Sequence, residues 1–220
     1  MTLASWRVSR GEPAHHGALI ALEGHGREDG VVATDPGAVE SGTVPLDTSA
    51  TVGWFTSVYP VRLGDGEAVI DVDTAANTPD SARTLLRAVS EKLATVPNRG
   101  LDYGLLRYLR GDETLAGFAG PQLEFNYLGR HDLSADQSRS EWSLVTTPEL
   151  TGQLPVVPEP DLPLRYTFDV TSIVAGGKGD ADGPILVTSW RWSDQLHDAA
   201  DVDRLSQLWL RAVTVLGEAL

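Results

Sequence analysis

The run ALIALEGHGRE at residues 18–28 combines a hydrophobic strand pattern with a chemically versatile end. Its first six residues form a short apolar stretch that is typical of a buried β-strand. The stretch ends on Glu23, and two glycines interrupt the chain directly after it, which leaves the backbone open to a ligand. A carboxylate at the end of a buried strand is partly desolvated, which raises its pKa and makes it a better base near neutral pH. The residues alone leave two roles open for Glu23, a base or a structural ion pair with Arg27.

Composition restricts the partners that the chain can have. It carries 17 Lys and Arg against 31 Asp and Glu, a net charge of −14 at pH 7. Proteins that bind nucleic acid or anionic membranes present basic surfaces, so neither partner is expected. No apolar run approaches the roughly 20 residues of a membrane-spanning helix, and the first residues lack the order of a signal peptide. We expect a cytoplasmic protein, and the lack of Cys excludes disulfides and thiolate metal sites.

The remaining pattern predicts a single domain of mixed α and β structure. Expected strands lie at 18–23, 51–63, 68–72, 122–128, 164–174 and 185–192, and expected helices at 80–96, 101–109 and 202–220, with a helical turn near Leu115. Loops are expected at 29–49 and 129–162, although a strand around Trp142 is compatible with the pattern. Pro60 predicts an edge strand or a bulge. This order of elements indicates an α/β sandwich with a mixed sheet and helices on one face.

Four motifs follow one another along the chain. They are LEGHGRE at 22–28, TVGWFTSVYPVRL at 51–63, GLDYGLLRYL at 100–109 and FNYLG at 125–129. Together they resemble the signature motifs of epimerization domains from nonribosomal peptide synthetases, within the condensation-domain superfamily. The third motif departs from the usual pattern at Leu101-Asp102, whereas the Glu-Gly-His-Gly-Arg run distinguishes the chain from condensation domains. The resemblance covers the chain and implies that residues 1–220 are the C-terminal lobe of such a domain.

The resemblance implies a fold and a reaction. Epimerization domains resemble two chloramphenicol-acetyltransferase-like lobes, each an α/β sandwich, arranged as a V. A peptidyl carrier protein delivers an aminoacyl or peptidyl thioester on its phosphopantetheine arm into the cleft between the lobes. The α-proton is removed and returned on the other face, which gives a mixture of L and D products. No metal and no soluble cofactor is expected.

The resemblance also assigns roles to residues of the first and last motifs. Glu23 corresponds to an acid/base residue of the family. Asn126 and Tyr127 are expected near the active site, where they polarise the thioester carbonyl or stabilise the enolate oxygen. His25 and Arg27 are expected to support Glu23 rather than to react.

The second motif supplies aromatic residues with two interpretations. Trp54, Phe55 and Tyr59 can line a channel for the substrate and its pantetheine arm, or they can pack in the core. Core packing is the more common fate of such side chains. Both interpretations remain open at the level of the sequence.

The chain lacks the other catalytic motif of the family, His-His-x-x-x-Asp-Gly, which belongs to the N-terminal lobe. His15-His16 is followed by Gly-Ala-Leu-Ile, without the Asp, and lies directly before the strand of Glu23 instead of a lobe upstream. We therefore expect a loop pair here, a missing N-terminal lobe and no epimerase activity of the isolated chain. A zinc site made of His15, His16, Glu23 and His25 matches no standard ligand spacing, so no metal is expected.

Two functions remain open. The chain can be one half of an epimerase, completed by an N-terminal lobe from the same or another polypeptide. It can also be a truncated, non-catalytic epimerization-like domain whose exposed apolar face docks a carrier protein or recruits a tailoring enzyme. A free-standing acyltransferase of the chloramphenicol-acetyltransferase type needs a catalytic His in a His-x-x-x-Asp setting and is not favoured.

Overall fold

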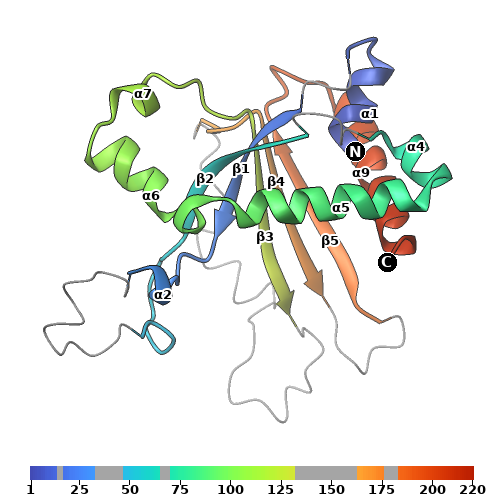
Figure 1. Ribbon diagram of the computed structural model, residues 1–220. Coiled ribbons are helices and arrows are strands. Elements are labelled where there is room, and N and C mark those ends of the chain that lie inside the picture. The colour runs from blue at the N-terminus through green and yellow to red at the C-terminus, as the bar shows by residue number, and fades with distance from the viewer. Residues whose placement is uncertain (14–16, 33–46, 65–69, 132–162, 176–182) are drawn as a thin grey trace, which may run out of the picture.

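A computed structural model describes residues 1–13, 17–32, 47–64, 70–131, 163–175 and 183–220. These residues build a five-stranded sheet in the order β2-β1-β3-β4-β5 (Figure 1). The strands are β1 (Ala18–Gly24), β2 (Ser57–Leu63), β3 (Leu123–His131), β4 (Phe168–Ala175) and β5 (Ile185–Trp192). The central pairs β1/β3 and β3/β4 are parallel, and the outer pairs β1/β2 and β4/β5 are antiparallel. The predicted mixed α/β lobe is therefore confirmed.

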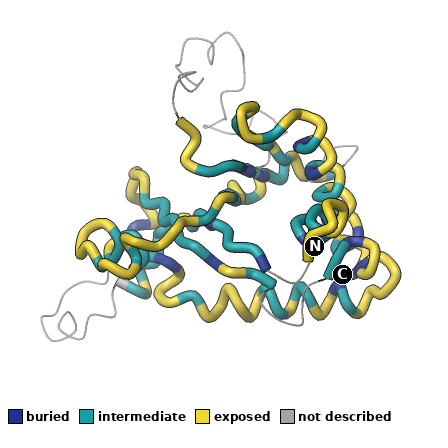
Figure 2. Tube along the Cα trace, turned by 90° about the horizontal axis from the view of Figure 1, so that it is seen from above, coloured by how far each residue is buried: buried dark blue, intermediate teal, exposed yellow. Residues whose placement is uncertain are grey.

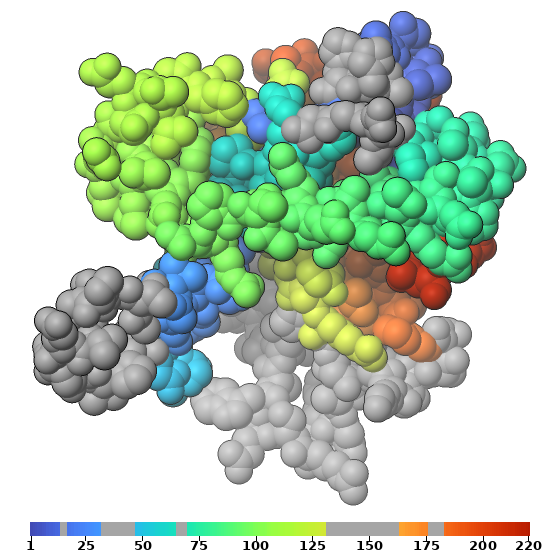
Figure 3. All heavy atoms as spheres, in the orientation of Figure 1, coloured from blue at the N-terminus to red at the C-terminus, as the bar shows by residue number. Residues whose placement is uncertain are grey.

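Helices lie around one face and one end of this sheet. They are α1 (Thr2–Ser9), α2 (Asp29–Val32), α4 (Val72–Asn77), α5 (Pro79–Ala94), α6 (Leu101–Gly104), α7 (Glu113–Ala116) and α9 (Ala199–Glu218). A 3₁₀ turn at Pro97–Gly100 and a π-helical turn at Leu105–Leu109 flank α6. The long helix α5 crosses the sheet obliquely (Figure 1) and forms a ridge across the surface of this side (Figure 3). Helices α1, α4 and α9 pack together beside it.

The main core lies between the sheet and helix α9. Strand β4 buries Phe168, Val170 and Ser172 in alternation, which is the period of a strand with one covered face. Leu205 of α9 is fully buried against this row, and half-buried Trp190 completes the layer from β5. Buried segments are also found where the two chain ends approach each other (Figure 2). We call this side of the sheet the helix face.

Helix α4 corrects a sequence prediction. The pattern predicts a strand at 68–72, of which 68–69 lie outside the described residues, while Val72 begins a helix. The Asp71 carboxylate accepts a hydrogen bond from the backbone N–H of Thr74 at 2.8 Å, a typical N-cap. Val72 and Ala75 then bury against α5 and α9. The cap and this second apolar cluster outweigh the β propensity of Ile70 and Val72.

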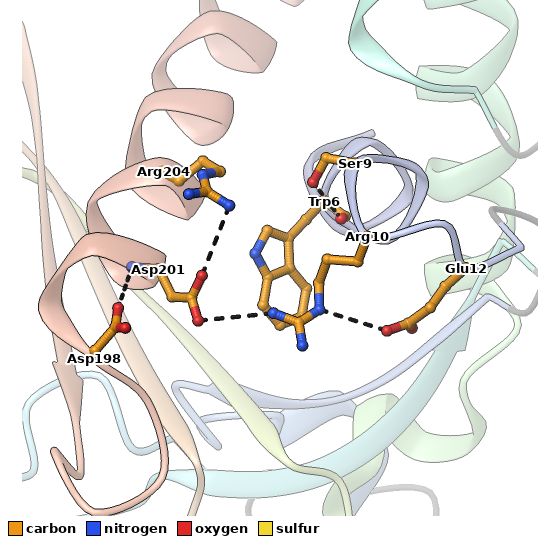
Figure 4. Close-up of polar contacts among 7 residues, drawn as sticks. All are labelled: Trp6, Ser9, Arg10, Glu12, Asp198, Asp201 and Arg204. Atoms are coloured by element: carbon orange, nitrogen blue, oxygen red, sulfur yellow. Dashed lines mark hydrogen bonds and ion pairs between the residues drawn. The ribbon is translucent and has the colours of Figure 1, made fainter.

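Helix α1, which the sequence pattern does not predict, is held against the start of α9 (Figure 4). The Arg10 guanidinium lies over the Trp6 ring at 5.0 Å and reaches the Asp201 carboxylate at 3.7 Å. Asp198 caps α9 by accepting the backbone N–H of Asp201 at 2.7 Å. Tertiary contacts of Trp6, rather than a strong apolar repeat, therefore stabilise α1.

The other predicted elements have mixed outcomes. The strands around 18–23, 122–128, 164–174 and 185–192 and the helices at 80–96, 101–109 and 202–220 are confirmed within a few residues at each end. The strand predicted at 51–63 begins only at Ser57, and its Pro60 lies on the edge strand β2, as expected. The position around Trp142 lies outside the described residues. Among the described helices, none is long and apolar enough to cross a membrane.

Candidate functional site

Glu23 lies on the side of the sheet opposite the helix face. Its neighbour Leu22 lines the apolar space between the sheet and α5, together with Phe125 of β3. Side chains alternate along a strand, so Glu23, Glu124 and Asn126 project to the other side. Residues of β4 and β5 extend this side as Asp169 and Arg191, which are opposite each other in the register. We call the surface made of Glu23, Glu124, Asn126, Asp169 and Arg191 the polar face.

The parallel pairing of β1 and β3 brings the first and last sequence motifs together. Leu22 lies opposite Phe125, so the residues that follow, Glu23 and Asn126, are neighbours across the two strands. The Asn126 side-chain amide donates a hydrogen bond to the Glu23 carboxylate. The two residues are 103 positions apart in the chain. The expected proximity of Glu23 and Asn126 is thus present in the structure.

Burial changes the acidity of Glu23. Partial desolvation is the main cause that raises its pKa, and the negative charge of Asp169 raises it further. Hydrogen bonds with Glu124 and Asn126 act in the opposite direction, because they stabilise the ionised form. The net direction is upward, toward the range in which a carboxylate can accept and return protons near neutral pH.

A second carboxyl group, Glu124, belongs to the same site although the sequence motifs do not include it. Its pKa is raised to about 7, first by burial, then by the charges of Glu23 and Asp169, while Arg165 lowers it. Glu124 and Glu23 lie at diagonal positions on the same face of the neighbouring strands β3 and β1. The only sequence signal was its position two residues before Asn126, which places both on one side of a predicted strand.

His25 and Arg27 hold the segment after β1 rather than the Glu23 carboxylate. Arg27 donates hydrogen bonds to the carbonyl oxygens of Thr48 and Thr51, the latter at 2.7 Å. The imidazole of His25 is exposed, accepts the backbone N–H of Arg27 at 3.0 Å and lies 3.4 Å from Glu28. These contacts join the first and second motifs, and their support of Glu23 is limited to fixing the chain at the end of β1.

Gly26 is required for this junction. It has a φ of +66°, and a Cβ atom there would lie 1.5 Å from the carbonyl oxygen of Phe55. The Arg27 guanidinium in turn lies 4.4 Å from the centre of the Phe55 ring. Only glycine allows the segment around Phe55 to lie this close to the end of β1.

The three aromatic candidates do not share one channel. Trp54 is 91% exposed, and Phe55 stacks beneath Arg27. Tyr59 packs on Gly100, where a Cβ atom would lie 1.9 Å from its ring. Tyr59 also lines a cavity of about 120 Å³ next to Ala21, whose wall includes Tyr108 and Arg165 near the polar face. Of the three, only Tyr59 thus lies at this cavity, whose wall includes Ala21, the residue opposite Glu124.

Tyr127 lies on the other side of the sheet from Asn126. It is opposite Ser172, whose side chain bonds Thr188 at 2.9 Å on the helix face. Tyr127 is 51% exposed. A direct action of Tyr127 on a group bound beside Glu23 therefore requires a path around the end of β3, whereas Asn126 already touches Glu23.

Sequence and structure comparisons agree on the kind of protein. The chain is 32% identical over 199 residues to one of the linear gramicidin synthase polypeptides of Brevibacillus parabrevis, covering 88% of this chain and 2% of that protein. It is 34% identical over 188 residues to chondramide synthase cmdD of Chondromyces crocatus, covering 85% of this chain and 4% of that protein. No family model matches.

A solved structure has the same fold. The epimerization domain from the third module of tyrocidine synthetase B matches 99% of this chain with a TM-score of 0.63 and 21% identity. The chain is part of a condensation/epimerization-type domain of a nonribosomal peptide synthetase. It spans 41% of that solved domain and only a few per cent of the two synthases.

The described histidines do not form an acyltransferase-type or metal site. His197 has Asp201 four residues later, so the His-x-x-x-Asp spacing of an acyltransferase does occur. The structure uses these residues otherwise, because the His197 ring stacks on Phe168 at 4.7 Å and Asp201 pairs with Arg10 (Figure 4). His15-His16 lies outside the described residues. Within the described ranges no cluster of three His, Cys, Asp or Glu could hold a metal ion.

Proposed function

We propose that this chain is the C-terminal lobe of an epimerization domain that interconverts the L and D forms of a carrier-bound aminoacyl or peptidyl thioester. The observation that supports this most is the Glu23 carboxylate, half-buried on the polar face and held by the Asn126 amide. A raised pKa at such a position suits removal and return of an α-proton. Because the chain resembles peptide synthases along most of its length, we expect it to act in the cytoplasm as part of such an enzyme.

The reaction needs more than this lobe supplies. Inversion at a carbon acid requires a proton donor and a proton acceptor on opposite faces of the α-carbon, or one group that reaches both. It also requires a closed cleft from which water is excluded. Glu23 supplies one acid/base group, and a second lobe with the His-His-x-x-x-Asp-Gly motif is proposed to supply the other group and the second wall. The phosphopantetheine arm of a peptidyl carrier protein would bring the thioester, and no further cofactor is proposed.

The roles of the other residues follow from their contacts. Asn126 orients Glu23 through its amide and can polarise a thioester oxygen only if that bond is rearranged. Arg27 and His25 fix the segment that follows β1. Tyr59, beside the cavity that adjoins the polar face, is the aromatic residue best placed to meet a substrate side chain or the pantetheine arm.

Exchange of the α-proton with solvent tests this proposal. A carrier protein loaded with a panel of aminoacyl thioesters is incubated in D₂O with the chain, with and without an N-terminal lobe bearing the histidine motif. We expect deuterium at the α-carbon only when both lobes are present, and loss of at least about 100-fold in rate for Glu23→Gln. The exposed Glu113→Gln serves as the matched control and should exchange at the rate of the unaltered chain.

Two results would contradict the proposal. Undiminished exchange by Glu23→Gln with both lobes present would remove Glu23 from the reaction. Carrier binding without any exchange, with both lobes and every thioester of the panel, would instead favour the non-catalytic docking function.

A further inference from the structure

Glu124 stands out among the ionisable groups of the described residues because the motifs leave it without a role. Position 124 lies opposite Ala21 of β1 on one side and opposite Asp169 of β4 on the other. Its side chain and that of Glu23 project to the same face of the adjacent strands β3 and β1, at diagonal positions of the register. Two carboxyl groups on neighbouring strands of one face repel each other when both are ionised, which favours a proton on one of them.

We propose that Glu124 is a positioning residue that retains this proton and donates it in a hydrogen bond to the Glu23 carboxylate, so that the two groups titrate as a coupled pair. This inference rests on the proposed function of Glu23 and adds a residue to its site. Asn126 donates to Glu23 as well, so the catalytic carboxylate is held by two donors. Such a pair fixes the direction of the Glu23 oxygens toward the substrate.

The neighbouring groups decide which member keeps the proton. Glu23 accepts from the Asn126 amide, which favours its ionised form. Glu124 instead lies between two acidic groups, Glu23 and Asp169, and its pKa is raised to about 7 by burial and by these two charges. Below about pH 7 the proton of the pair is therefore assigned to Glu124.

The charged groups on every side are consistent with this assignment. From β5, the exposed Arg191 directs its guanidinium to Asp169, with Nε at 3.1 Å. From the segment before β4, Arg165 lowers the pKa of Glu124, but it also donates to the Tyr108 hydroxyl of the π-helical turn at 2.6 Å. Tyr166 beside it is an un-ionised phenol whose pKa burial and Glu124 raise further. From β2, the residue opposite Glu23 is Val58, which brings no charge.

The coupling is measured on the full chain by following the carboxyl carbons of ¹³C-labelled glutamate by NMR from pH 3 to 9. In the unaltered chain we expect Glu23 and Glu124 to share a two-step titration, with the second step near 7. In Glu23→Gln the midpoint of Glu124 should fall by about 1 pH unit, because the neighbouring negative charge is gone. In Glu124→Gln the second step should vanish from the Glu23 curve. Glu113→Gln should change neither curve.

The outcomes separate this inference from the proposed function. An unchanged Glu124 midpoint in Glu23→Gln, or a Glu23 curve that keeps its second step in Glu124→Gln, would overturn the pair. The exchange assay with both lobes adds a second readout. The exchange rate of Glu124→Gln should no longer show the change with pH that the unaltered chain shows near pH 7. If Glu23 and Glu124 titrate together but no α-proton exchange is detected, the coupled pair is supported and the proposed epimerase function is contradicted. If exchange depends on Glu23 but the two carboxyl groups titrate independently, the proposed epimerase function is supported and the coupled pair is contradicted.

Discussion

The two faces of the sheet differ in what their side chains contribute. The helix face holds Phe168, Val170 and Leu205, which are almost completely buried. The polar face holds carboxylates and an amide that are only partly buried, with Glu124 between Glu23 and Asp169. Burial of apolar area stabilises a domain, whereas burial of like charges costs stability. The comparison indicates that this sheet obtains its stability on one face and carries an energetically unfavourable cluster of acidic side chains on the other.

Truncation of the helix face should have the largest effect. Leu205→Ala removes a side chain that is 0% exposed and leaves a cavity against β4. We expect the free energy of unfolding to fall by about 3 kcal/mol, measured by urea denaturation followed by tryptophan fluorescence. Leu210→Ala on the same helix, at 60% exposure, is the matched control and should change little. Equal losses for both variants would show that α9 does not pack as described.

Removal of a charge from the polar face should have a smaller effect of opposite sign. The pKa of Glu124 is raised from 4.5 to about 7 by folding, so its contribution to stability is fully present below about pH 4.5 and is lost as the pH rises through 7. Glu124→Gln cannot ionise and escapes this loss. We expect it to be more stable than the unaltered chain by about 1 kcal/mol at pH 8, a value reduced by solvent screening, and equally stable near pH 4.

Urea denaturation at the two pH values measures this difference directly. The exposed Glu113→Gln is the control, because it removes the same charge from a surface helix. A Glu124→Gln variant that is less stable than the unaltered chain at pH 8 would mean that the carboxylate is favourably paired there.

The smallest effect is expected at the rim of the polar face. Arg191→Gln removes an exposed guanidinium from its ion pair with Asp169. Exposed pairs contribute little, so the free energy of unfolding by urea at pH 7 should change by less than about 1 kcal/mol. The double-mutant cycle with Asp169→Asn isolates the pair, and a coupling energy above about 2 kcal/mol would show that the pair is more shielded than its exposure indicates.

Long periodic elements were predictable from sequence, and elements held by distant contacts were not. Helix α5 and strand β1 carry clear apolar repeats, and both were predicted nearly to their ends. Helix α1 depends on Trp6 and Arg10 packing on α9, and α4 on the Asp71 cap, signals that are weak beside local propensity. The second motif predicts one long strand, but only Ser57–Leu63 pairs with β1, while the carbonyl oxygen of Thr51 at the start of the motif accepts a hydrogen bond from Arg27.

The candidate site shows the same division. The motifs identified Glu23 and Asn126, and the register of two parallel strands brings them together. Glu124 was missed because its importance depends on Asp169 and Glu23, neither of which is near it in the chain. Tyr127 was predicted with Asn126 as one unit, although adjacent strand residues face opposite sides.

The β1/β3 pairing has a consequence for folding. Within the described strands, three residue pairs join β1 to β3, at Ile20, Ala21 and Leu22, whereas β1 pairs with β2 along its full length. The pairing also closes a loop of about a hundred residues, which makes it slow to form and a natural place for the sheet to open. The candidate site around Glu23 and Asn126 bridges this seam, so it assembles only when the two halves of the sheet meet. The contact between Glu23 and Asn126 therefore depends on the least extensive pairing described for β1.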